Sequence, residues 1–75
     1  MTNNLHGLAD QAVKQGFDLY FINKLIEEHG VEAVQLLLEG LEKGFTRTWL
    51  VELVQWGGKV GLEALSMLLK NYNPN

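Results

Sequence analysis

Apolar residues recur along the chain with the spacing of short amphipathic helices. Leu5, Leu8, Ala9, Ala12 and Val13 follow one another at helical spacing, so they share one face of a helix. Glycines and cap-forming residues interrupt this pattern, and no segment alternates in the way a half-buried strand does. We therefore predict an all-α fold, a compact bundle in one domain over residues 1–75. The pattern predicts about five short helices, at about 5–15, 18–29, 31–43, 47–56 and 60–72.

Two of these helices begin with the same local signal. Phe17 precedes Asp18, a favourable N-cap, and Ile22 lies four positions later, which is the arrangement of a hydrophobic staple. The second start repeats the pattern with Phe45, Thr46 and Leu50. We expect the side chains of Asp18 and Thr46 to accept hydrogen bonds from backbone amides of the first turn. We expect glycines to end the helices, at Gly16, Gly30, Gly44 and Gly58.

A longer similarity contains these two starts. The segment from Gln15 to Gly30 resembles the segment from Lys43 to Gly58 after a shift of about 28 residues. Four positions are identical, namely Gly16/Gly44, Phe17/Phe45, Leu25/Leu53 and Gly30/Gly58. A unit that recurs with such a period is typical of stacked helix pairs, in which one pair cannot bury its apolar face alone. The sequence therefore predicts an internal helix-turn-helix repeat.

The last two predicted helices carry more apolar surface than one bundle needs. A surface helix directs an arc of about 100° toward its core, whereas the apolar arcs of these two helices cover roughly 220°. No later helix follows the fifth one to cover its second side. We therefore expect a second copy or another protein to cover it. The alternative is that five helices wrap tightly enough to bury the whole arc.

We expect the contact with a partner to centre on one large aromatic residue and three leucines of the last helix, Trp56, Leu62, Leu65 and Leu69. Trp56 replaces Glu28 of the first unit, so packing of the repeat does not require an aromatic side chain there. The three leucines lie at the edge of the last helix farthest from Val60 and Met67, which we expect to face inward. Trp49 takes the place of a phenylalanine in the first unit, so we expect it in the core.

Composition and charge exclude several classes of protein. A chain of 75 residues buries a thin core, and because it has no cysteine it has neither a disulfide nor a thiolate metal site. The net charge is −3 and the six basic residues are scattered, whereas a nucleic-acid binder shows a basic face. The chain has no long apolar run and no basic leader, so we expect a cytoplasmic protein. Oligomerisation remains as a source of stability, most simply a homodimer with two-fold symmetry.

Candidate chemistry is sparse. His6 and Asp10 lie four apart on one helix, but the only serine is Ser66 and no nucleophile accompanies them, so we interpret them as an exposed pair. His29 falls inside the apolar arc of the second helix, where it can donate to free carbonyls at the helix end. The glycines around Gly57 lack the spacing of a phosphate-binding loop, and they would instead allow a hinge or a close helix contact. We expect no catalytic residue, no metal and no cofactor.

These observations favour a small, non-catalytic protein-interaction module, such as an adaptor, an inhibitor or a regulatory subunit. It would self-associate, bind a protein partner, or do both, through its C-terminal helices. Association with a membrane surface is the second hypothesis, and it is weakened by Glu52 and Glu63 on the polar faces. Helix-turn-helix binding of nucleic acid is the third. It is weakened because Arg47 lies near Glu52, so we expect no nucleic-acid partner.

Overall fold

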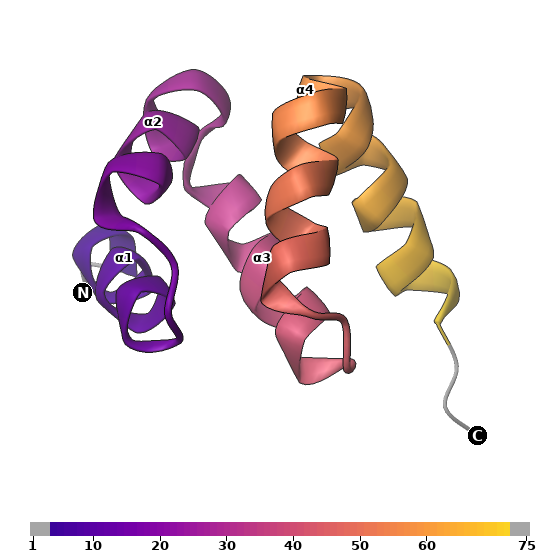
Figure 1. The fold of residues 1–75 in the computed structure, drawn as a ribbon, viewed down its shortest axis with the longest axis horizontal. Coiled ribbons are helices and arrows are strands. Elements are labelled where there is room, and N and C mark those ends of the chain that lie inside the picture. Colours follow the sequence, from indigo (N-terminus) through magenta and orange to yellow (C-terminus); the bar gives the residue numbers. More distant parts are fainter. Residues whose placement is uncertain (1–3, 73–75) are drawn as a thin grey trace.

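The computed structural model describes residues 4–72, with side chains described from Gly7 onward. This part of the chain is all-helical, without strands, and forms α1 (Asn4–Lys14), α2 (Leu19–His29), α3 (Val31–Glu42) and α4 (Arg47–Asn71). α4 is interrupted at Gly58, whose φ of 53° and ψ of −131° are not helical. We call residues 47–57 the first arm of α4 and residues 59–71 the C-terminal arm. The two arms run in nearly opposite directions in Figure 1.

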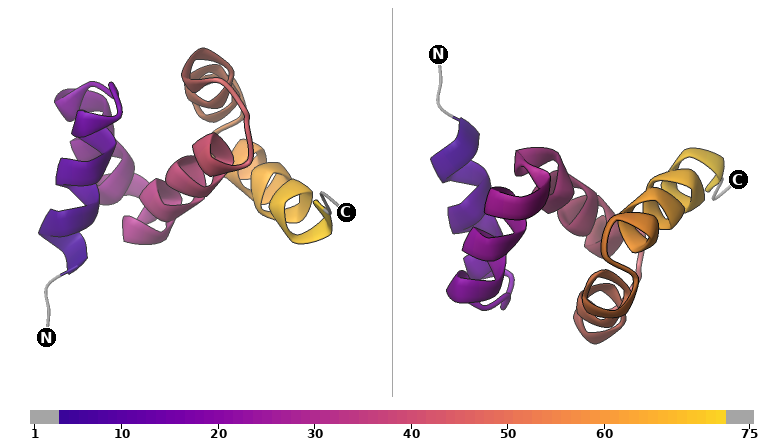
Figure 2. Two further views of the ribbon diagram at one scale, coloured as in Figure 1. Left: turned by 90° about the horizontal axis from the view of Figure 1, so that it is seen from below. Right: turned by 90° about the horizontal axis from the view of Figure 1, so that it is seen from above.

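α3 is the central helix of the bundle. It packs against α1, α2 and α4, and Figure 2 shows α1 and α2 on one side of it and the two arms of α4 on the other. Gly40 of α3 is buried against α4, and a Cβ atom there would lie 2.8 Å from Leu50 Cδ2. Leu50 can therefore rest directly on the backbone of α3. The buried core consists of Ala12, Phe17, Ile22, Leu25, Ala33, Val34, Leu37, Leu50, Val54, Leu62 and Leu65.

The joints α1–α2 and α3–α4 have the same backbone hydrogen bonds. At the end of α1, Gly16 N donates to Val13 O and Phe17 N donates to Ala12 O. The end of α3 repeats this pattern two helices later, with Gly44 N to Leu41 O and Phe45 N to Gly40 O. Both are Schellman motifs, in which a glycine with positive φ leaves the helix and the next apolar residue turns back onto it.

The N-caps that follow these joints are also alike. Asp18 Oδ2 accepts a hydrogen bond from Phe21 N at 3.0 Å, and Thr46 Oγ1 accepts one from Trp49 N at 3.1 Å. These are the cap hydrogen bonds that the two staples predict. Arg47 connects the joints, because its Nη1 donates to Gln15 O at 3.1 Å.

The predicted number of helices is not confirmed. The fourth and fifth predicted helices belong to one element, α4, because the chain leaves helical geometry at Gly58 alone. The other helices lie within one residue of the predicted limits: α1 ends at Lys14, α2 begins at Leu19 and α3 ends at Glu42. The two joints are alike, but Gly30 separates two elements whereas Gly58 lies inside one. The internal repeat therefore stays a prediction.

Removing either cap should destabilise the fold by a similar amount. Asp18→Ala and Thr46→Ala each leave a first-turn amide without its side-chain acceptor, so each should lower the free energy of unfolding by about 1 kcal/mol. Thr48→Ala is the matched control, because Thr48 is exposed inside α4 and should change stability by less than about 0.5 kcal/mol. Urea denaturation measures all three. Equal effects at Thr46 and Thr48 would contradict the capping role.

Candidate interaction surface

The reversal at Gly58 determines which side of the C-terminal arm faces the core. Gly61 is buried beside the first arm, and a methyl group on it would overlap the carbonyl oxygen of Leu53. The two arms can therefore approach backbone to backbone only because residue 61 is a glycine. With Gly61 directed at the first arm, Leu62 and Leu65 enter the core and the opposite side of the C-terminal arm points to solvent.

The exposed side of the C-terminal arm is apolar. Val60 is 71% exposed, Met67 is 63% exposed and Leu68 is 45% exposed, and the small Ala64 between them is exposed as well. Their spacing of three or four residues places these four side chains on one face of the helix. We call Val60, Ala64, Met67 and Leu68 the outer face. Trp56, just before the reversal, is 87% exposed.

The predicted assignment of faces on the last helix is wrong for most of its residues. Leu62 and Leu65 are only 7% and 0% exposed, and Leu69 is partly buried against the core, so these leucines do not form an exposed surface. Val60 and Met67, expected to face inward, face outward. The apolar arc is wide enough to contain two faces, and the contact of Gly61 with the first arm selects the leucine face for burial. Of the four predicted interface residues, only Trp56 is freely accessible.

An aromatic cluster holds the end of the C-terminal arm near the α3–α4 joint. The rings of Phe45 and Trp49 stack with centroids 5.0 Å apart, and Tyr72 meets Phe45 edge-on at 6.3 Å. Lys43 Nζ lies 5.6 Å from the centre of the Tyr72 ring, a cation–π distance. Trp49 is 39% exposed, so the expectation that it lies in the core is wrong. It instead covers Phe45 at the surface.

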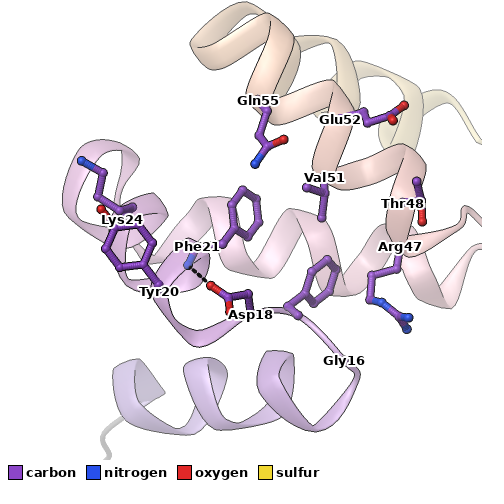
Figure 3. Close-up of a pocket in the computed structure, with 11 residues that line it drawn as sticks. Gly16, Asp18, Tyr20, Phe21, Lys24, Arg47, Thr48, Val51, Glu52 and Gln55 are labelled. Carbon is purple, nitrogen blue, oxygen red and sulfur yellow. Dashed lines mark hydrogen bonds between the residues drawn. The ribbon is translucent and has the colours of Figure 1, made fainter.

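A groove of about 590 Å³ separates α2 from the first arm of α4. Figure 3 shows its apolar part, with Phe21 of α2 near Val51 of α4. Its charged groups are largely engaged in contacts within the fold. Asp18 caps α2, and Arg47 donates to the Gln15 carbonyl. No histidine of the described residues lines the groove.

The histidines form no recognisable site in the described structure. The expected pairing of His6 with Asp10 lies outside the described side chains. His29 is partly buried at the end of α2, and its Nε2 lies 3.9 Å from Glu28 Oε1. Within the described residues, no three His, Asp or Glu side chains gather in a way that could hold a metal ion. The outer face, with Val60 and Met67 at 71% and 63% exposed, is an exposed apolar feature of this part of the chain.

Comparison with protein-family models, with curated proteins and with solved structures finds no match to the chain. Within residues 4–72, no helix combines the length and the apolar character needed to cross a membrane.

Two leucines of the C-terminal arm provide a matched test of which face is buried. Leu65→Ala removes a fully buried side chain, so it should lower the free energy of unfolding by about 2–5 kcal/mol. Leu68→Ala makes the same chemical change at a side chain that is 45% exposed, and it should cost less than about 1 kcal/mol. Thermal or urea denaturation of the two variants measures the difference. A larger loss for Leu68→Ala would contradict the burial of the leucine face.

Proposed function

We propose that the chain is a small non-catalytic interaction module that self-associates through the outer face of its C-terminal arm. The observation that carries the proposal is the exposure of Val60 and Met67, at 71% and 63%, on a helix whose other apolar side is already in the core. Large apolar side chains grouped on one exposed face are characteristic of protein contact surfaces. Adaptors, inhibitors and regulatory subunits use surfaces of this kind.

The spacing of the outer face suits pairing of two helices. Val60, Ala64, Met67 and Asn71 follow one another at intervals of four, three and four residues, which is the spacing of the inner positions of a coiled coil. In an antiparallel pair with a two-fold axis, Ala64 of each copy lies opposite Met67 of the other. A small residue then faces a large one in both central layers, which favours close packing. Val60 lies opposite Asn71 at each end.

The charges beside this seam are complementary in the same arrangement. Glu63 and Lys70 occupy equivalent positions along one edge of the outer face, one heptad apart. In the antiparallel pair, Glu63 of each copy comes next to Lys70 of the other, so the two-fold axis generates two pairs of opposite charge. A parallel pair would place Glu63 beside Leu68 instead. The charge pattern therefore supports a second copy, paired antiparallel, as the occupant of the outer face.

Such a dimer is expected to be weak. Each C-terminal arm offers about four turns of helix, and interfaces that bury less than about 1,200 Å² in total are typical of transient complexes. The exposed ring of Trp56 lies just before the seam, and tryptophan is enriched among residues that dominate binding energy. We expect a dissociation constant in the micromolar range or weaker, which suits a module whose assembly responds to concentration.

The two alternative functions fit the described residues less well. Insertion of the outer face into a membrane surface would favour basic residues on both flanks, whereas Glu63 lies between Lys59 and Lys70. In a nucleic-acid complex, Arg47 would be the natural phosphate contact at the start of α4. Its guanidinium instead donates to the Gln15 carbonyl within the fold.

A charge placed on the seam should dissociate the dimer. Met67→Glu introduces a carboxylate opposite Ala64 of the second copy, and its desolvation should weaken self-association at least tenfold while leaving the fold intact, because residue 67 is exposed in the monomer. Light scattering over a range of protein concentrations measures the mass, and circular dichroism measures helicity. Leu19→Glu, at an exposed leucine of α2, is the matched control and should leave the mass unchanged.

Exchange of the flanking charges tests the antiparallel register. Glu63→Lys and Lys70→Glu should each weaken the dimer severalfold, and the double variant should restore it, because only the double variant again pairs opposite charges. A wild-type chain that remains at 8.5 kDa into the millimolar range would contradict self-association. Co-sedimentation of the wild type with anionic vesicles, lost in Met67→Glu, would favour the membrane hypothesis instead.

A further inference from the structure

We propose that α4 opens at Gly58 and that its C-terminal arm then takes the same place in a second copy of the chain, giving a dimer with exchanged arms. This inference does not depend on pairing of the outer face, because the exchanged dimer forms through the core residues Leu62 and Leu65. It rests on the geometry of the reversal.

The hinge is a single residue. Hydrogen bonding along α4 is helical on both sides of Gly58, and only the torsion angles of this residue depart from the helix, with φ of 53° and ψ of −131°. A change at this one position would convert the two arms into one continuous helix of 25 residues. Such a helix carries the C-terminal arm away from its own core, and short hinges of this kind favour exchange between copies.

The interactions of the arm can be reproduced between two copies. Leu62 and Ser66 line the same cleft as Ala33 and Leu36, so the arm contacts the central helix α3. In an exchanged dimer these contacts would form again, with the arm supplied by the other molecule. The closed monomer and the exchanged dimer therefore differ chiefly at the hinge, and the geometry of the hinge sets the balance between them.

Two glycines shape the closed form, and only one of them distinguishes it from the exchanged dimer. Gly58 adopts a positive φ that L-residues rarely tolerate, and Gly61 touches the carbonyl of Leu53, where no methyl group fits. A continuous helix removes the constraint at residue 58, which becomes helical. The constraint at residue 61 remains, because the exchanged arm takes the same place against Leu53 of the second copy. An alanine at residue 58 therefore penalises the closed form and favours exchange, whereas an alanine at residue 61 penalises both forms.

Three glycine variants test the proposal by sedimentation velocity. In Gly58→Ala, strain at the hinge should lower the population of the closed form about tenfold. Forming one exchanged dimer relieves two strained hinges, so the dissociation constant of the dimer should fall about a hundredfold. Gly61→Ala should not favour the dimer, because the added methyl group overlaps the carbonyl of Leu53 in the closed monomer and in the exchanged dimer alike. Gly57→Ala is the matched control. Gly57 has no positive φ and no atom within 4 Å of an added Cβ, so this variant should keep the wild-type mass.

Cross-linking identifies the exchange itself. One chain carries Leu36→Cys and the other carries Ser66→Cys, both in the Gly58→Ala background. These positions line one cleft between α3 and the C-terminal arm, and the natural chain has no cysteine. After mixing, a short bismaleimide should join the two different chains, and adding Met67→Glu to both should not prevent it. If Gly58→Ala is monomeric, folded or unfolded, or if its dimer gives no cross-link, the proposal is overturned.

Discussion

The contact between Gly61 and the carbonyl of Leu53 is the interaction on which the C-terminal half depends. It brings the two arms of α4 together at backbone distance and fixes the rotation of the second arm about its own axis. Because one side of that helix is held against the first arm, Leu62 and Leu65 complete the core around α3. A larger side chain at residue 61 would separate the arms and withdraw these leucines from the core.

The same rotation produces the exposed apolar surface. The C-terminal arm has apolar side chains around more than half of its circumference, and burying the leucine face leaves Val60, Met67 and Leu68 outside. The aromatic cluster of Phe45, Trp49 and Tyr72 holds the far end of the arm and maintains this orientation. Stability and the proposed function therefore share one helix. Its inner side contributes to the core, and its outer side is available to a second copy.

Local signals in the sequence predicted local structure well, whereas the facing of the last helix could not be predicted. Asp18 and Thr46 act as caps because a cap depends only on residues within one turn, and the sequence contains all of them. The inward side of an arc that is apolar over about 220° depends instead on what the helix packs against. The contact between Gly61 of one arm and Leu53 of the other determines which side of the helix is buried. The periodicity of a single helix does not predict such a contact. The same limit explains Trp49, which resembles a core position by alignment yet lies at the surface.

Thiol reactivity along the C-terminal arm would test this account most directly, because the natural chain contains no cysteine. Single cysteines are introduced by Val60→Cys, Leu62→Cys, Leu65→Cys and Met67→Cys, and their rates of alkylation are measured in dilute and in concentrated protein. In dilute protein, we predict that cysteines at positions 60 and 67 react fast and that cysteines at 62 and 65 react more slowly by orders of magnitude. As the protein concentration rises, the rates should fall at positions 60 and 67 alone. Fast reaction at 62 and 65 with slow reaction at 60 and 67 would contradict the rotation of the arm. Rates at 60 and 67 that do not depend on concentration would contradict self-association through the outer face.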